Sequence, residues 1–162
     1  MWNIINKQSQ ELLQTCILKK MYITTAESCT GGMVASSIIS INGSSSIFKS
    51  GIVTYSNESK AEFLKIPLES ININGAVSET IAFQMAKNVL SIMNSTVSIA
   101  VTGIAGPSGG SNGKPVGLVW IAIGTKENVL TKKYLFQGNR LKIRQHTTFE
   151  ALKLANGVIN HY

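Results

Sequence analysis

Cysteine and histidine are both scarce in this chain, and their scarcity excludes several kinds of protein. The cysteines are Cys16 and Cys29, and the histidines are His146 and His161. Two cysteines in segments that we predict to be helical do not make a disulfide framework, and none of the paired Cys or His spacings of a zinc site occurs. We therefore expect no disulfide, no bound metal and a reducing, cytoplasmic location.

Long apolar runs and dense basic runs are also missing. No stretch approaches the roughly 20 apolar residues of a membrane span, and residues 1–20 lack the continuous apolar core and cleavage site of a signal peptide. The formal net charge is +7, but the cations are scattered and are not interleaved with aromatic residues. We expect neither a membrane nor a nucleic acid as partner, whereas a phosphorylated small molecule fits the charge.

The composition that is present is typical of one compact domain. Hydrophobic residues make up 44% of the chain and charged residues only 14%, which is enough apolar material for a core. A length of 162 residues suits one domain with a substantial core and is too short for two. We predict a single domain over residues 1–162.

Hydrophobic periodicity predicts strands that alternate with helices. Helices are expected over residues 6–20, 28–39, 56–67, 78–93 and 141–158, and strands over 22–25, 47–55, 97–101, 116–124 and 129–136. Residues 71–76 are predicted to be a loop. This order indicates the α/β class, as a three-layer α/β/α sandwich with a mixed, mostly parallel sheet. The last two strands form a predicted hairpin, which offers a surface for pairing two copies into a dimer.

The stretch TTAESCTGG, residues 24–32, is predicted to be a strand end, a polar turn and the first turn of a helix. Ser28 would then lie at a helix N-terminus, where backbone N–H groups have no partner within the helix. A hydroxyl in that position could act as a nucleophile. The amides of residues 30–32 would then stabilise the oxyanion that forms on the attacked carbonyl group. The alternative is an ordinary N-cap, for which serine is a preferred residue.

The stretch VTYSNESK supplies Tyr55 at a strand end and Lys60 near the start of the following helix. Desolvation would favour the uncharged amine of Lys60, which could accept the proton of Ser28, while Tyr55 relays the proton or holds the amine. In the alternative, Lys60 is solvated and Tyr55 is a packed side chain. Because ligands bind beyond the carboxyl ends of parallel strands, we expect residues 27–31, 54–60 and 103–113 to meet there.

The glycine-rich stretch TGIAGPSGGSNGKP allows bare backbone to approach an anion, but it also suits a tight turn. It does not match a P-loop, because Pro115 follows Gly113 and Lys114. Arg140 and Arg144, one turn apart in the last predicted helix, could grip a phosphate or form a solvated face.

Two other nucleophiles compete with Ser28. Cys29 shares the predicted helix start, but both histidines that could activate its thiol lie in the last helix or the tail. Ser46 and Lys49 match the S-x-x-K spacing of penicillin-interacting enzymes, a pattern that is common by chance, and the companion K-T-G is absent.

Several motifs occur in a fixed order along the chain: AESCTGG, GSSSIFKSGIVTYSNESK, GAVSE, TGIAGPSGG, KPVG and GNR. Together they resemble the C-terminal domain of the CinA competence-damage proteins, which also occurs alone as the PncC-type nicotinamide-nucleotide amidase. The resemblance extends over nearly the whole chain. It implies an enzyme that converts nicotinamide mononucleotide to nicotinate mononucleotide and ammonia, without metal or cofactor, so the expected partner is a pyridine nucleotide.

The resemblance also implies roles for individual residues. The family's serine nucleophile falls on Ser28, and its tyrosine and lysine fall on Tyr55 and Lys60. The predicted substrate-binding residues are Thr30, Gly31, Gly32, Gly103, Gly106, Gly109 and Arg140. The competing hypothesis is a regulatory module that binds a pyridine nucleotide but performs little chemistry.

Overall fold

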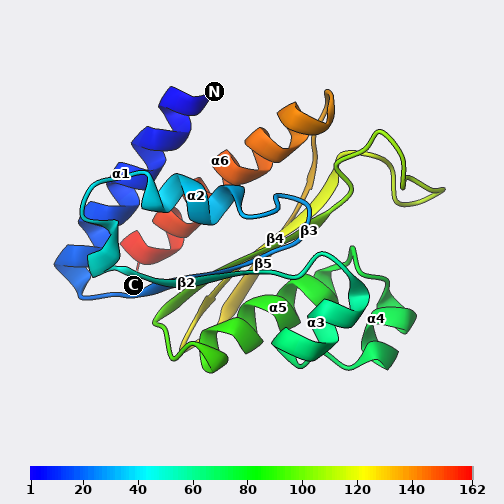
Figure 1. Ribbon diagram of the computed structural model, residues 1–162, viewed down its shortest axis with the longest axis horizontal. Coiled ribbons are helices and arrows are strands. Elements are labelled where there is room, and N and C mark those ends of the chain that lie inside the picture. Colours follow the sequence, from blue (N-terminus) through cyan, green and yellow to red (C-terminus); the bar gives the residue numbers. More distant parts are fainter. Residues whose placement is uncertain (162) are drawn as a thin grey trace.

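A five-stranded sheet forms the middle layer of the molecule, and helices cover both of its faces (Figure 1). The computed structural model describes residues 1–161, and Tyr162, the last residue of the predicted domain, lies outside them. The helices on one face are α1 (Trp2–Lys19), α2 (Met33–Ile39) and α6 (Arg140–Asn160), and those on the other are α3 (Asn57–Leu64), α4 (Leu68–Asn74) and α5 (Glu79–Ile92). The predicted three-layer α/β/α sandwich is confirmed.

The sheet has the strand order β2-β1-β3-β4-β5. Its strands are β1 (Ile23–Glu27), β2 (Phe48–Val53), β3 (Val97–Gly103), β4 (Leu118–Thr125) and β5 (Val129–Leu135). Strand β1 pairs in parallel with β2 and β3, while β4 is antiparallel to β3 and β5. Four strands therefore share one direction, and β4 runs antiparallel to them. The predicted mixed, mostly parallel sheet with a terminal hairpin is confirmed. Pairing of two copies through this hairpin stays a prediction.

Small residues determine how one face of the sheet packs. Ala26, Ala100 and Ala122 lie side by side on β1, β3 and β4, and all three are fully buried. They pack in one cluster with the buried face of α5, which includes Met85 and Val89. Because methyl side chains occupy little depth, α5 can lie close to the sheet. The opposite face carries Val and Ile side chains, which pack against α1, α2 and α6.

The predicted loop over residues 71–76 is wrong, because helix α4 occupies most of it. Pro67 stands at the N-cap with φ of −58°, and Gly75 ends the helix at φ of +77°. Proline at a helix start and glycine at its end are the usual arrangement, so both boundaries were visible in the sequence. The helix buries only Ile71. A single buried residue does not produce the repeated spacing of apolar residues by which a helix is predicted from sequence.

The predicted start of the second helix is also wrong. Helix α2 begins at Met33, and Ser28 lies in a turn before it. Gly31 and Gly32 have φ of +58° and +90°, which is the left-handed region and cannot continue a right-handed helix. The Ser28 hydroxyl therefore lies at the end of β1 rather than at a helix N-cap.

Leu12 tests the buried face of α1. This side chain is fully buried in the core that α1 shares with α6, whereas Leu18 on the same helix is 83% exposed. We expect Leu12→Ala to lower the free energy of unfolding by about 2–5 kcal/mol and Leu18→Ala to change it by less than about 0.5 kcal/mol. Urea denaturation followed by circular dichroism measures both, and equal losses would contradict this packing.

Candidate active site

A cavity of about 300 Å³ opens at the carboxyl ends of β1, β2 and β3. Ser28 follows β1, Tyr55 follows β2 and Gly103 ends β3, and all three side chains or backbones line the cavity. Lys60 of α3 and Arg140 of α6 also line it. The three segments that we expected to meet at this edge of the sheet therefore do so.

The buried amine of Lys60 contacts the hydroxyl of Ser28. Lys60 Nζ lies 3.3 Å from Ser28 Oγ and donates to the carbonyl oxygen of Thr54 at 2.8 Å. Only 1% of Lys60 and 8% of Ser28 is exposed. Burial lowers the pKa of Lys60, because a charged ammonium loses its hydration there. Among the described residues no carboxylate lies within ion-pair distance of this amine, so no carboxylate offsets the cost of charging it.

Helix α3 fixes the position of Lys60. Ser56 caps the helix, accepting from the backbone N–H of Ser59, while the Ser59 hydroxyl accepts from the backbone N–H of Ser56. This reciprocal capping box satisfies two amides of the first turn. Lys60 and Leu64 are the buried residues of the helix and, four residues apart, lie on one face. The helix thus directs the amine of Lys60 into the protein, where the amine contacts the Thr54 carbonyl oxygen and the Ser28 hydroxyl.

The turn after Ser28 is held by hydrogen bonds within the protein. The Ser28 amide donates to the Val101 carbonyl at 3.0 Å, and the Gly31 amide donates to the Ser28 carbonyl at 3.0 Å. The Gly32 amide donates to Glu27 Oε2 at 3.1 Å. The amides of Gly31 and Gly32 are therefore already engaged and cannot serve as oxyanion donors in this conformation. Neither glycine lines the cavity, and their substrate-binding role stays a prediction.

Thr30 also lies outside the cavity lining, although it was predicted to bind substrate. Its side chain is fully buried, and its hydroxyl donates to Glu27 Oε2 at 2.6 Å. Within the described part of the chain, the amides of Cys29 and Thr30 donate to no acceptor. Of these two residues only Cys29 lines the cavity, whereas Thr30 is fully buried, so the Cys29 amide is the donor of the turn that is still available to a ligand.

Arg140 lies at the mouth of the cavity and holds Tyr55. Its Nη1 donates to the Gly106 carbonyl at 2.8 Å, and its Nη2 donates to the Tyr55 hydroxyl at 2.7 Å. Tyr55 is 60% exposed, and its hydroxyl contacts Arg140 rather than Lys60. The structure therefore brings Tyr55 into the same cavity as the Ser28–Lys60 pair but does not place it as their proton relay.

The two arginines at the start of α6 point to different partners. Arg144 donates through Nε and Nη2 to the carbonyl of Thr30, at 3.3 and 2.7 Å. Arg140 binds Gly106 and Tyr55 instead. They do not form a common grip for one anion, and Arg140 alone lines the cavity.

The glycine loop contributes backbone to the opposite wall of the cavity. Gly103, Gly106 and Gly109 all line it, as predicted. A Cβ on Gly103 would lie 2.6 Å from Val119 Cγ2 and 2.9 Å from the Leu118 carbonyl, so this position admits no side chain. Gly106 has φ of +75°, a left-handed conformation that glycine adopts without strain, and its carbonyl oxygen accepts a hydrogen bond from Arg140.

The rival nucleophiles fit the geometry less well. Burial raises the pKa of the Cys29 thiol to about 12, so it stays protonated at neutral pH although it lines the same cavity. Ser46 donates to the Gly43 carbonyl, while the Lys49 amine donates to the Asn94 carbonyl. Ser46 and Lys49 are therefore engaged with different partners and do not form a pair.

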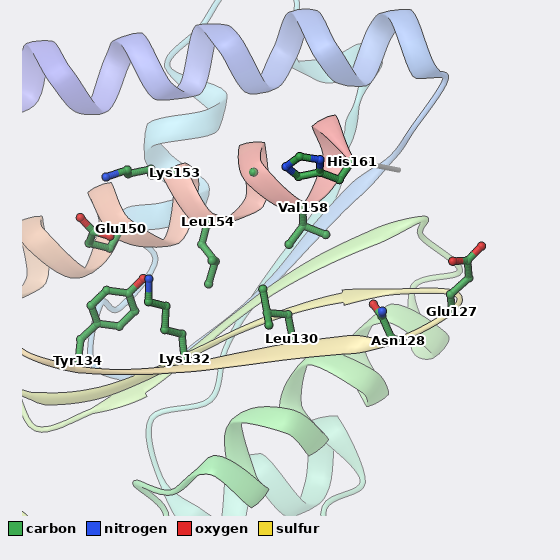
Figure 2. Close-up of a pocket in the computed structure, with 11 residues that line it drawn as sticks. Glu127, Asn128, Leu130, Lys132, Tyr134, Glu150, Lys153, Leu154, Val158 and His161 are labelled. Atoms are coloured by element: carbon green, nitrogen blue, oxygen red, sulfur yellow. The ribbon is translucent and has the colours of Figure 1, made fainter.

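A second cavity, of about 480 Å³, lies between β5 and the C-terminal half of α6 (Figure 2). Leu130, Leu154 and Val158 form its apolar part, and Lys132 and Glu150 lie at one end beside Tyr134. No serine, threonine or cysteine lines it among the described residues. It is larger than the Ser28 cavity but, among residues 1–161, offers no pair of a serine and a buried lysine.

Glu27 is the residue of this region that the sequence interpretation missed. It is 1% exposed and accepts four hydrogen bonds, from the Thr30 hydroxyl and from the amides of Gly32, Val34 and Ala35. A carboxylate at the end of an apolar strand, just before a polar turn, is the pattern that could have revealed it. Thr102 and Asn57 line the cavity and were also not predicted.

Residues 1–161 contain neither a membrane-spanning helix nor a cluster of metal ligands. No helix there is long and apolar enough to cross a membrane. Nor do three or more histidine, cysteine or acidic side chains of these residues gather as metal ligands.

Known proteins of one kind are similar to this chain. The family described as the CinA C-terminal domain matches residues 5–159. A putative competence-damage inducible protein of Caldicellulosiruptor bescii is 43% identical over 89% of this chain, and a CinA-like protein of Fervidobacterium nodosum is 42% identical over 95% of it. These matches cover 35% and 38% of the relatives, so the chain spans about a third of the length of the curated relatives it matches.

Solved structures share the fold over nearly the whole chain. The competence/damage inducible protein CihA from Agrobacterium tumefaciens is 36% identical with a TM-score of 0.94, covering 97% of this chain and 96% of that one. A competence-damaged protein (CinA) superfamily protein from Escherichia coli is 33% identical with a TM-score of 0.90, covering 96% and 89%.

The buried amine of Lys60 predicts how stability depends on pH. The pKa of Lys60 is lower in the folded protein than the roughly 10.4 of an unfolded chain, so between these two values the unfolded chain binds more protons. Stability should therefore rise with pH through that window. Lys60→Met should flatten the rise and stabilise the protein most at the low-pH end, whereas Lys7→Met, on the exposed side of α1, should do neither. Urea denaturation at a series of pH values measures this, and parallel curves for wild type and Lys60→Met would contradict it.

Proposed function

Because the chain belongs to the family of CinA C-terminal domains, we propose that it is an amidohydrolase that converts nicotinamide mononucleotide to nicotinate mononucleotide and ammonia. The observation that carries the proposal is the contact between the Ser28 hydroxyl and the buried amine of Lys60. A serine beside an amine with a lowered pKa is the arrangement of a nucleophile and its general base. A cytoplasmic location is part of the proposal.

In the first half of the reaction, Ser28 Oγ attacks the carboxamide carbon while Lys60 Nζ takes the hydroxyl proton. The carbonyl oxygen becomes an oxyanion, for which the available amide of Cys29 is the candidate donor. As the tetrahedral intermediate collapses, the C–N bond breaks and Lys60 returns the proton to the departing nitrogen. Ammonia leaves, and the nicotinoyl group stays on Ser28 as an ester.

In the second half, water replaces ammonia. Lys60 takes a proton from the water as its oxygen attacks the ester carbon, and then gives the proton to Ser28 Oγ as the C–O bond breaks. The products are the free serine and a carboxylic acid, which loses its remaining proton to solvent and leaves as the carboxylate. The cycle needs the amine of Lys60 to be uncharged at its start, which its desolvation favours.

The charge of the cavity supports an anionic substrate. Arg140 lies at its mouth, and no carboxylate of the described residues lines it. The backbone of Gly106 and Gly109 faces the same space. We assign the phosphate of the nucleotide to this end, with Tyr55 and Arg140 holding the substrate rather than moving protons.

A second candidate function is a nucleotide-binding regulator with little turnover. The observation that favours it is the placement of Tyr55, which is bonded to Arg140 and not to the amine of Lys60. The regulator would bind nicotinamide mononucleotide without releasing ammonia, so one assay separates the two functions.

Ser28→Ala tests the nucleophile. We expect release of ammonia from nicotinamide mononucleotide to fall by about 10⁴-fold or more, because no covalent intermediate can form, while calorimetric binding of the nucleotide is retained. Ser46→Ala, which removes the exposed rival hydroxyl, should leave the rate unchanged. Turnover by Ser28→Ala would remove the serine mechanism, and binding without turnover by the wild type would favour the regulator.

Arg140→Met tests the phosphate assignment. Loss of a charge-assisted hydrogen bond should raise KM for nicotinamide mononucleotide by about 10- to 100-fold. KM for nicotinamide riboside, which lacks the phosphate, should change little. Lys142→Met, an exposed cation in the same helix turn, controls for a general loss of charge. An equal rise of KM for both substrates would show that Arg140 does not hold the phosphate.

A further inference from the structure

We infer that Glu27 and Arg144 clamp Thr30 from two sides, and that Thr30 positions the nucleophile turn instead of contacting the substrate. This inference rests on the proposed function for its kinetic readout. It assigns positioning roles to two residues, Glu27 and Arg144, that lie outside the cavity lining. It also replaces the predicted substrate-binding role of Thr30.

Glu27 forms the first side of the clamp. Its Oε2 accepts from the Thr30 hydroxyl at 2.6 Å and from the amides of Gly32 and Val34 at 3.1 and 3.0 Å. Its Oε1 accepts from the amide of Ala35 at 2.8 Å. These amides belong to the N-terminus of α2, where the helix dipole also favours a negative charge. One carboxylate therefore ties the start of α2 to the residue in the middle of the turn.

Arg144 forms the second side. Its guanidinium donates twice to the carbonyl of Thr30, at 2.7 and 3.3 Å, across 114 residues of sequence. The hydroxyl and the carbonyl of Thr30 are thus held by side chains from β1 and α6. With its carbonyl fixed, the peptide plane that follows Thr30 cannot rotate freely, and the left-handed Gly31 and Gly32 complete the turn.

Hydrogen bonds also connect this clamp to Lys60, the proposed general base. The backbone carbonyl of Glu27 accepts from the amide of Thr54 at 2.8 Å, and the carbonyl of Thr54 accepts from Lys60 Nζ. Ser28, the next residue after Glu27, contacts that same Nζ. Glu27 is therefore joined through its side chain to the turn of the nucleophile and through its backbone to the amine that deprotonates it.

A positioning role and a substrate contact predict different kinetics. If Thr30 touched the substrate, its loss would weaken binding and raise KM. If Thr30 only holds the turn, the loss of its hydroxyl misplaces Ser28 Oγ and the free amide of Cys29, which are used in the transition state, and kcat falls while KM is kept.

Thr30→Val and Thr30→Ser make the matched pair. Valine keeps the shape of threonine but leaves Glu27 without one of its donors, whereas serine keeps the hydroxyl. We expect kcat for nicotinamide mononucleotide to fall by about tenfold or more in Thr30→Val, as for the loss of one hydrogen bond to a charged group, with KM within about twofold. Thr30→Ser should stay within about threefold of the wild type. A KM effect at constant kcat, equal losses in both variants, or no loss in Thr30→Val would each overturn the inference.

Arg144→Met provides a second variant in case Thr30→Val does not fold. Arg144 is only partly buried, and its replacement removes both hydrogen bonds to the Thr30 carbonyl. It should lower kcat with KM kept, while Lys153→Met, an exposed cation on the same helix, should change neither. An unchanged kcat in Arg144→Met would contradict the second side of the clamp.

The clamp can be judged even if the proposed function fails. A fluorophosphonate forms a bond between phosphorus and Ser28 Oγ, releases fluoride and passes the serine proton to Lys60, so it needs no natural substrate. The rate of Ser28 modification, measured by mass spectrometry, should be slower in Thr30→Val than in Thr30→Ser. Equal rates in the two variants would overturn the clamp, whereas absence of ammonia release by the wild type would overturn only the proposed function.

Discussion

Burial of the Lys60 amine is the constraint on which the rest of the site depends. An ammonium group in this position would lose its hydration without gaining a carboxylate among the described residues, so the folded protein favours the uncharged amine. The uncharged amine keeps two contacts, with the Thr54 carbonyl and with the Ser28 hydroxyl. The cap of α3 and the hydrogen bond between Thr54 and β1 keep these partners in place.

A second buried ionisable residue, Glu27, directly precedes Ser28 in the sequence, and the fold keeps its carboxylate apart from the Lys60 amine. Glu27 directs its carboxylate to the N-terminus of α2, on one face of the sheet, where four donors satisfy it. Ser28 directs its hydroxyl to Lys60, whose helix α3 covers the other face (Figure 1). An ion pair between Glu27 and Lys60 would stabilise the ammonium form and abolish the base. Alternation of side chains at the end of β1 prevents it.

The sequence predicts this fold well because strands and helices alternate with strong periods, and because the carboxyl ends of parallel strands meet. That geometry brought Ser28, Tyr55, Lys60, Arg140 and the glycine loop into one cavity, as expected. The sequence could not show which polar groups pair inside it. The partner of Tyr55 is an arginine 85 residues away, and the amides of Gly31 and Gly32 are engaged locally. Helix α4 was missed because it buries too little to produce a periodic pattern.

The adjacency of Glu27 and Ser28 makes this centre unusually intolerant of length changes. Because consecutive strand residues face opposite sides, inserting or deleting one residue in β1 would exchange the two side chains. The carboxylate would then enter the cavity beside Lys60, and the hydroxyl would be left facing the amides of α2. A single codon gained or lost in this strand would convert a nucleophile and base into an inert ion pair while the five-stranded sheet could still assemble.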